Sequence, residues 1–137
     1  MCQEHFLRFV TDAEAEVELL PWGRHEWLSR AGLTGAEQLQ LVRVKMPPGK
    51  AHAFHRHPGF EEVLYILEGR AEQWVGRSKR ILGPGESAFV PTNEVHGTYN
   101  IFAEPLTFLA ILSPAHFDGP PLIDVSQDEP WRSIRLA

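Results

Sequence analysis

The sequence contains a single cysteine, Cys2, among its 137 residues. An intramolecular disulfide is therefore excluded, and we expect Cys2 to lie in a frayed terminus rather than to act as a reactive thiol. The sequence also lacks the basic segment and apolar stretch of a signal peptide, and no apolar run approaches the roughly 18 residues that a membrane span needs. These absences predict a cytoplasmic protein that does not interact with membranes.

Positive charge is also scarce. The chain has 13 Lys and Arg against 18 Asp and Glu, which gives a formal net charge of −5. No block rich in Lys or Arg offsets this balance, so nucleic acid is not an expected partner. The length is that of one domain, and a chain of this size buries roughly 68% of its unfolded surface, enough for a core.

The sequence has no long amphipathic helical pattern. Instead, short β-branched or alternating segments are separated by turns rich in Gly and Pro, as is typical of strands. The clearest of these predicted strands are 24–29, 38–46, 51–57, 61–67, 70–76, 80–82, 87–90, 96–102 and 106–112. Short strands at this spacing predict an all-β sandwich or barrel.

A strand is predicted over residues 3–20, and its second part, 12–20, is ambiguous. Its acidic and apolar residues alternate, which predicts a strand with one solvated face. Its Ala and Glu residues also favour helix, and Thr11 and Asp12 are suitable N-cap residues. We prefer the strand. In the following predicted strand, His25 and Trp27 share a face.

Chemistry-bearing residues gather in the middle of the chain. His55 and His57 are two apart, so on a strand their side chains point to the same face. Glu61 and Glu62 follow after a Pro-Gly turn, and His96 begins a later strand. Imidazole and carboxylate ligands suit Zn, Fe, Mn, Co, Ni or Cu, so these residues predict a metal site above a sheet.

Two motifs in this region resemble those of the cupin superfamily. The first is Gly49-x5-His55-x-His57-x4-Glu62-x6-Gly69. The second is Gly85-x5-Pro91-x-Asn93-x2-His96-x3-Asn100. Asn93 stands where the family usually has glycine, and Asn is the residue that best tolerates the left-handed conformation such a turn needs. The short spacer 70–84 matches small microbial cupins, and the resemblance covers residues 49–100.

The resemblance implies a single cupin domain over 1–137, a double-stranded β-helix or jelly-roll barrel with one divalent transition metal ion per chain at its centre. Carried over by position, the ligands are His55, His57, Glu62 and His96, and the spacing to Gly69 excludes Glu61. N-terminal strands or an arm would occupy 1–37, the conserved barrel 38–112, and a C-terminal tail 113–137. We expect this tail to pack over the outside, anchored by Trp131 and Ile134.

Three neutral imidazoles and one carboxylate leave a divalent site with a net positive charge, which attracts a small anionic or oxygen-rich molecule. The resemblance therefore implies a mononuclear metalloenzyme acting on a small organic substrate. Dioxygenation is the preferred reaction, because it needs mainly the metal and an apolar cup, whereas a decarboxylase would want an acid on a lid and no Glu-bearing lid loop interrupts 70–100. The alternative is a non-catalytic metal-containing module that binds or senses a small molecule. An open cup with a polar group near the metal would favour the enzyme.

Several positions carry simpler expectations. Strand parity places His52 opposite to His55, so we expect it to be exposed. Surface or packing roles are the default for the three histidines outside the motifs, which are His5, His25 and His116. Either Gln73 or Trp74 must face inward. Arg43 is expected to face outward, although an inward Arg43 would clamp a carboxylate. Strand-like residues at both ends of the chain predict a homodimer formed through terminal strands.

Overall fold

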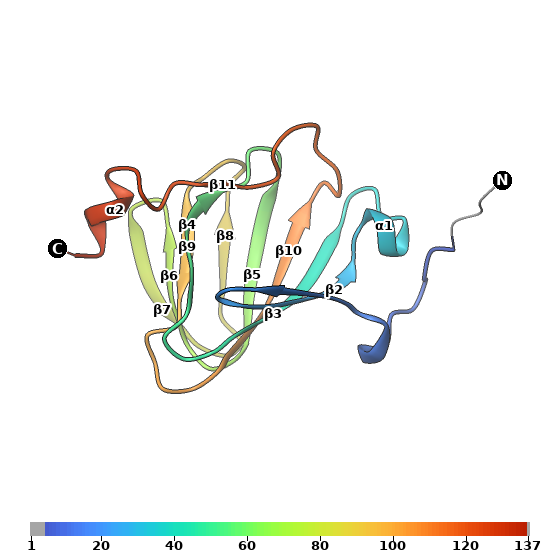
Figure 1. Cartoon of the computed structure of the whole chain (residues 1–137), viewed down its shortest axis with the longest axis horizontal. Helices are drawn as coiled ribbons and strands as arrows, with labels where there is room; N and C mark the ends of the chain where they lie inside the picture. The colour runs from blue at the N-terminus through green and yellow to red at the C-terminus, as the bar shows by residue number, and fades with distance from the viewer. Residues whose placement is uncertain (1–4, 137) are drawn as a thin grey trace.

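The computed structural model describes residues 5–136, so the prediction about Cys2 lies outside the described residues (Figure 1). The strands are β1 (Glu16–Leu20), β2 (Gly23–Ser29), β3 (Gln40–Met46), β4 (Ala51–Arg56), β5 (Glu61–Glu68), β6 (Ala71–Val75), β7 (Ser78–Leu82), β8 (Ser87–Val90), β9 (His96–Tyr99), β10 (Leu106–Ser113) and β11 (Ile123–Asp124). Two one-turn helices, α1 (Ala31–Thr34) and α2 (Trp131–Ile134), flank the barrel. No helix within residues 5–136 is long and apolar enough to cross a membrane.

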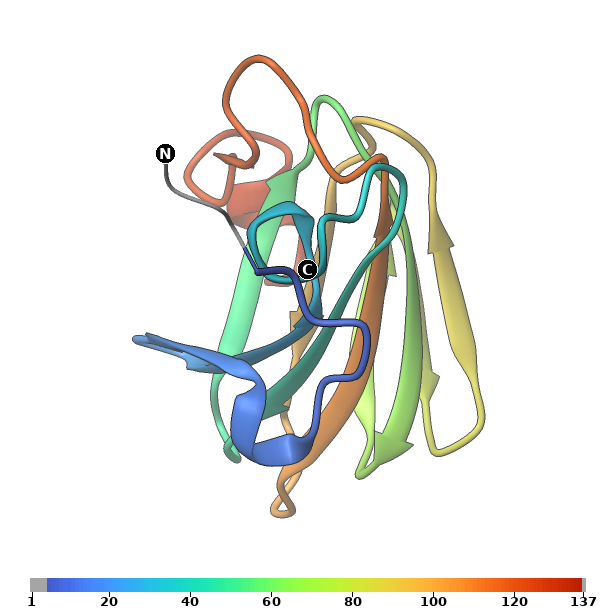
Figure 2. The same cartoon turned by 90° about the vertical axis from the view of Figure 1, so that its right-hand side faces the viewer.

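The strands form two antiparallel sheets that face each other (Figures 1 and 2). The first has the order β1-β2-β3-β10-β5-β8 and the second the order β11-β4-β9-β6-β7. Several neighbours, such as β3 and β10 or β4 and β9, come from distant parts of the chain, as in a jelly roll. The all-β, double-stranded β-helix prediction is therefore confirmed.

Period-2 alternation places the core between the two sheets. Along β3, Val42, Val44 and Met46 are buried, while the intervening side chains are more exposed. Strand β10 repeats this pattern and pairs with β3 and β5 on its two sides. Because alternate side chains point to opposite faces, each of these strands contributes one apolar row to the interior.

The ambiguous segment 12–20 divides into two structures. Thr11 and Glu14 form a capping box, with the Thr11 backbone N–H and hydroxyl each donating to Glu14 Oε1 at 3.0 and 2.9 Å. This box closes a one-turn 3₁₀ helix over Asp12–Glu14. The chain then extends from Glu16 as β1, which pairs with β2 in a hairpin at the edge of the first sheet. The predicted strand is therefore wrong for residues 5–15 and confirmed from Glu16 onward, and its residues 3 and 4 lie outside the described residues.

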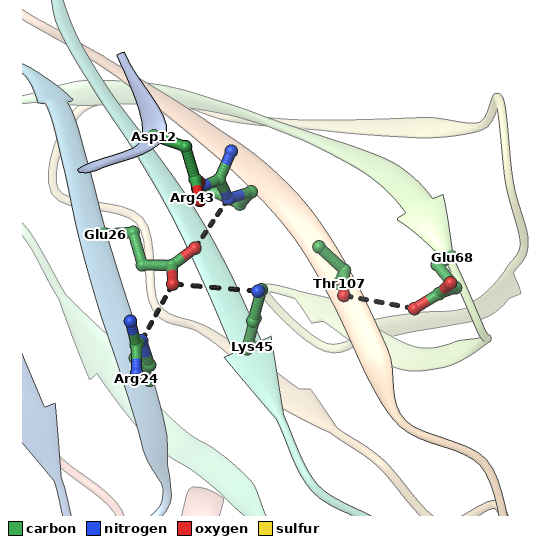
Figure 3. A network of polar contacts seen from close by, with 7 residues as sticks. All are labelled: Asp12, Arg24, Glu26, Arg43, Lys45, Glu68 and Thr107. Atoms are coloured by element: carbon green, nitrogen blue, oxygen red, sulfur yellow. Dashed lines mark hydrogen bonds and ion pairs between the residues drawn. The ribbon is translucent and has the colours of Figure 1, made fainter. Parts of the chain in front are cut away.

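Arg43 lies on the outer face of the first sheet, away from the interior (Figure 3). Its Nε donates to Glu26 Oε1 at 2.6 Å, and the guanidinium also pairs with Asp12. Glu26 Oε2 accepts from Arg24 at 2.8 Å and lies 3.7 Å from the Lys45 amine. The outward alternative for Arg43 is confirmed, and its charge stabilises a carboxylate that is only 3% exposed.

The end of the tail packs on the outer face of the second sheet, as expected. Trp131 and Ile134 lie against an apolar cluster that includes Phe54 and Trp74. The Trp131 and Phe54 rings are 5.3 Å apart, centroid to centroid. These contacts fix the C-terminal segment to β4 and β6.

Candidate metal centre

Three histidines converge on one point at the end of the second sheet. His55 on β4 and His96 on β9 are directly opposed in the antiparallel register, and His57 follows immediately after β4. One ring nitrogen from each of the three lies within 4.8 Å of the others. The antiparallel pairing and the short step from His55 to His57 therefore bring together residues that are far apart in the sequence.

Each of these rings is oriented by a backbone carbonyl. The acceptors are the carbonyl oxygens of Ala53, Pro121 and Glu94, which lie 2.7, 2.9 and 3.0 Å from Nδ1 of His55, His57 and His96. Nδ1–H donates in each of these bonds, so Nε2 carries the lone pair that faces the centre. A hydrogen bond of this kind on the far ring nitrogen fixes the tautomer and aims the ligand atom of metal-binding histidines.

Glu62 lies beside this cluster. Its Oε1 is 3.0 Å from His96 Nε2 and 3.3 Å from His57 Nε2, and the residue is only 5% exposed. Glu61 is exposed on the opposite face of β5, as strand parity requires. The residues that the cupin motif selected are thus brought together, and the competing glutamate is not.

The ionisation of the cluster follows from burial and mutual contact. Burial alone would raise the pKa of the Glu62 carboxyl, but the adjacent His57 and His96 rings hold that pKa well below its usual range. Burial lowers the pKa of His57, yet the Glu62 carboxylate outweighs it and leaves that pKa raised. Burial holds the pKa of His55 well below its usual range, so His55 is neutral at pH 7.

Two buried atoms in the cluster, Glu62 Oε1 and His96 Nε2, have no hydrogen-bond partner among residues 5–136. They lie 3.0 Å apart, and with His96 Nδ1–H bonded to the backbone they are two facing acceptors whenever His96 Nε2 carries no proton. Such an arrangement is unfavourable in a buried site unless a cation lies near both. The donor set therefore fits a divalent transition metal ion.

The cluster opens onto a cavity of about 440 Å³. Inward side chains of β3 and β10, among them Val42, Val44 and Phe108, make an apolar wall. The hairpin of β1 and β2 contributes Trp22 and Trp27 to another wall. The cup is thus open and mostly apolar, with its polar groups near the histidines and the hairpin.

The prediction that His52 is exposed is wrong. Its ring stacks on His55, with centroids 3.7 Å apart, and it lines the cavity. His52 pairs with Thr98 and His55 with His96, so three steps along β4 match two along β9. This β-bulge reverses the side-chain parity between His52 and His55. Burial lowers the pKa of His52 to about 3.

The other histidines divide between packing and surface. His25 is packed between Trp22 and Trp27, and it lines the cavity, which no sequence motif indicated. His5 is exposed, and His116 lies at the cavity rim with its side chain 77% exposed. A packing or surface role is therefore confirmed for all three histidines. The sequence did not indicate, however, that His25 forms part of the cavity wall.

Gln73 is the residue of β6 that faces inward. It accepts a hydrogen bond from the Thr98 hydroxyl at 2.6 Å, and Thr98 lines the cavity. Trp74 points outward into the cluster around Phe54. Pairing of Gln73 with Thr98 across β6 and β9 explains this choice, because directly opposed residues share a face.

The first part of the tail does not lie on the outside. Segment 115–122 lines the cavity through residues that include Phe117 and Pro121, and the Pro121 carbonyl orients His57. Phe117 lies against Gly59 and faces the Phe60 ring. The expected tail position is therefore correct for α2 and wrong for this segment, which covers one side of the cup.

Comparison with known proteins agrees with this geometry. The model of the cupin domain family matches residues 42–112. The chain is 38% identical over 72 residues to the dimethylsulfoniopropionate lyase DddQ of Ruegeria pomeroyi, which is 52% of this chain but only 35% of DddQ. It is 27% identical over 111 residues to the pectin degradation protein KdgF of Dickeya dadantii, covering 81% of this chain and 96% of KdgF.

Solved structures extend the likeness in fold to nearly the whole chain. The polyketide cyclase RemF of Streptomyces resistomycificus superposes with a TM-score of 0.73 at 22% identity, over 96% of this chain and 94% of RemF. The DddQ structure superposes with a TM-score of 0.71 at 25% identity, over 85% of this chain and 64% of that one. With a family match over half of its length and the two-sheet barrel around a histidine cluster, this chain belongs to the cupin domain family.

Proposed function

We propose that this protein is a mononuclear metalloenzyme that acts on a small organic anion. The observation that carries the proposal is the convergence of His55, His57 and His96, each oriented from behind by a backbone carbonyl, at an open cavity of about 440 Å³. A cavity of this size accommodates a small molecule and lies in the range of ligand pockets.

Glu62 is the fourth proposed ligand. Its unpartnered Oε1, buried against two imidazoles, supports this role. The donor set suits Mn, Fe, Co, Ni, Cu or Zn, and one such ion per chain would supply a Lewis acid or an activator of bound water or oxygen. A single carboxylate leaves the site positive, which favours a substrate that presents an anionic oxygen.

The contents of the cup favour an enzyme over a binding module. A purely structural metal site is closed by its ligands, whereas this one opens onto a cavity. The polar ring of His52 stands next to a proposed ligand, where it can contact a bound molecule. The relatives named DddQ lyase and KdgF pectin degradation protein also point to small-molecule chemistry.

Dioxygenation remains our preferred reaction. The wall formed by Val42, Val44 and Phe108 supplies the apolar cup that this reaction needs besides the metal. No acidic side chain of segment 115–122 lines the cavity, so a lid acid of the kind a decarboxylase would use does not come from this segment.

The test begins with elemental analysis of the protein purified from its native host. Oxygen uptake is then measured for the metal-loaded protein and for His57→Ala with small organic acids, diketones, phenols and sugar acids. We expect uptake with one class only, and only in the metal-loaded wild type. Turnover without oxygen uptake would exclude the dioxygenase, and binding without any turnover would establish the non-catalytic alternative.

We also propose that the protein is a homodimer formed through its terminal strands. Strand β1 is a sheet edge, and its Val17 and Leu19 side chains are 50% and 76% exposed. A bare edge with exposed apolar side chains favours pairing with a second chain. Sedimentation at micromolar concentration should give the mass of two chains, and a monomeric mass would exclude this assembly.

A further inference from the structure

A row of aromatic rings runs from the histidine cluster to the β1–β2 hairpin. In order, the rings are His55, His52, Trp22, His25 and Trp27, with successive centroids 3.7, 4.4, 5.3 and 5.5 Å apart. All five of these residues line the same cavity. The row therefore forms one continuous wall that joins the proposed metal centre to a second polar group, Glu18 on β1.

Glu18 is held in place but keeps hydrogen-bonding capacity. Its Oε1 accepts from Trp27 Nε1 at 3.2 Å and from His25 Nδ1 at 3.2 Å. Within residues 5–136, its Oε2 makes no hydrogen bond. With Nδ1–H donated to Glu18, the Nε2 atom of His25 is also an acceptor, and it has no hydrogen-bond partner in the part of the chain that the structure describes. This end of the cavity thus offers acceptors that the protein itself does not use.

The charge at this end is negative. Burial raises the pKa of the Glu18 carboxyl, but hydrogen bonds from Trp27 and His25 lower it by more. Burial lowers the pKa of His25 despite the neighbouring carboxylate, so His25 is neutral at pH 7. Arg30 also lines the cavity, but it stacks over the Trp27 ring at 4.1 Å and pairs with Glu16 at 3.6 Å.

The two ends of the cavity are therefore complementary to different groups. A metal ion among the histidines attracts an anionic oxygen, whereas Glu18 and His25 accept hydrogen bonds and Glu18 adds negative charge. We infer that Glu18 and His25 form a second recognition site for a hydrogen-bond-donating group, a hydroxyl or an ammonium, at the end of the substrate remote from its metal-bound anionic group. This inference rests on the proposed function, because it assumes that the other end of the substrate meets the metal.

The substrate class that follows is a small organic acid with a hydroxyl or amino group at its far end. An unsubstituted acid of the same length would meet the metal equally well but would leave the Glu18 and His25 acceptors unpaired. Because the Glu18 side chain is 51% exposed, water can still reach it, and the preference over the unsubstituted acid is limited to the net gain of one hydrogen bond to a charged group. The Trp22 and Trp27 rings supply apolar surface for the carbon chain between the two polar ends.

The test uses the whole chain loaded with zinc, which has no redox chemistry and therefore allows binding to be measured alone. Titration calorimetry compares three matched acids: butyrate, 4-hydroxybutyrate and 4-aminobutyrate, with their three- and five-carbon analogues to allow for cavity length. Each is measured with the wild type, with Glu18→Gln and with Glu68→Gln. Glu68 is exposed at the end of β5 and does not line the cavity, so its variant controls for the lost charge.

We expect the hydroxy or amino acid to bind about tenfold more tightly than the unsubstituted acid, corresponding to one added hydrogen bond to a charged group. Glu18→Gln should abolish this preference, and Glu68→Gln should keep it. A preference for the amino acid alone identifies an ammonium, and a preference for the hydroxy acid alone identifies a hydroxyl.

Two other outcomes are separable. Equal zinc-dependent binding of all three acids to wild type and Glu18→Gln would overturn the second recognition site and leave the proposed metal function standing. Binding that is the same with and without zinc would overturn the proposed function and the inference together. Circular dichroism of Glu18→Gln guards against reading misfolding as lost recognition. Trp27→Phe, which removes a donor to Glu18, serves as a second variant and is checked in the same way.

Discussion

The imidazole of His52 stacks almost parallel on that of His55, with ring centroids 3.7 Å apart and an angle of 12° between the planes. Trp22 covers the other side of His52 at 4.4 Å. A proposed metal ligand is thus supported by a column of two rings in addition to its hydrogen bond to the Ala53 carbonyl. Support of this kind restricts the orientation of His55 before any ion binds.

Replacing His52 by Ala should therefore lower metal affinity. The column would lose its middle ring, and His55 would gain freedom that metal binding must then remove. We expect a loss of roughly tenfold, the lower end of the range for residues that orient ligands. Competitive titration against a chelator measures it. His52→Phe keeps a flat ring in the column and should retain most of the affinity, and equal affinities for wild type and both variants would show that the stack does not position His55.

The resemblance of the two motifs to the cupin superfamily implied this barrel and the grouping of the four proposed ligands, whereas strand period and turn residues, which are local properties, predicted the individual strands. Asn93 illustrates this: its φ of 66° is the left-handed conformation that its residue type suggested. The place of His52 could not be predicted in the same way. It depends on a bulge in the pairing of β4 with β9, and no residue in the sequence marks that bulge.

The far wall of the cup was missed for a related reason. His25 and Glu18 carry no motif, and their contact with the cavity depends on how the β1–β2 hairpin is placed relative to β4. The same holds for segment 115–122, whose Phe117 reaches the cavity by packing on a turn about 60 residues earlier in the chain. Parity predicts which face a side chain takes, but it does not predict which distant segment covers that face.

Replacing His57 by Ala should reduce bound metal towards the level of the metal-free protein. The variant loses one of three converging imidazoles and the ligand that segment 115–122 orients through Pro121. Elemental analysis after equal metal exposure measures the metal content per chain. His116→Ala is the matched control, since His116 lies at the cavity rim, pairs with Asp118 and is largely exposed. A metal content near one per chain in His57→Ala would refute the ligand assignment.

Metal affinity should fall as the pH falls from 7.5 to 5. A ligand histidine must be neutral to bind, and Glu62 raises the pKa of His57 in the metal-free protein. Protons therefore begin to compete with the metal for His57 at a pH above the ordinary histidine pKa of about 6.5. Each further pH unit of acidification lowers the metal affinity about tenfold for each competing proton. His55, whose pKa is lowered by burial, should not add to this loss in the same range. An affinity that stays constant between pH 7.5 and 5 would contradict ligation by histidine.

Replacing Asn93 tests the left-handed turn of the second motif. Asn93→Gly removes the side chain at a φ of 66°, where glycine is unstrained, so relief of the left-handed strain should partly offset the lost hydrogen bond from Arg56, 2.7 Å away. Asn93→Val places a β-branched side chain in the same conformation and should lower the free energy of unfolding by about 1–2 kcal/mol relative to Asn93→Gly. Urea denaturation measures both. Equal stabilities for the two variants would show that the turn relaxes to another conformation.

Gly59 connects the cupin motif to segment 115–122, and a Cβ added there would overlap the ring of Phe117. Gly59→Ala should therefore displace Phe117 and lower the free energy of unfolding by about 1–3 kcal/mol, the usual cost of overpacking. Gly32→Ala is the matched control, because a Cβ at Gly32 meets nothing within 4 Å and alanine favours the α1 conformation. Since Phe117 and Pro121 belong to the same segment, Gly59→Ala should also weaken the bond between the Pro121 carbonyl and His57 and lower metal affinity. If Gly59→Ala matched Gly32→Ala in both urea denaturation and metal titration, the segment would not be coupled to the metal centre through Phe117.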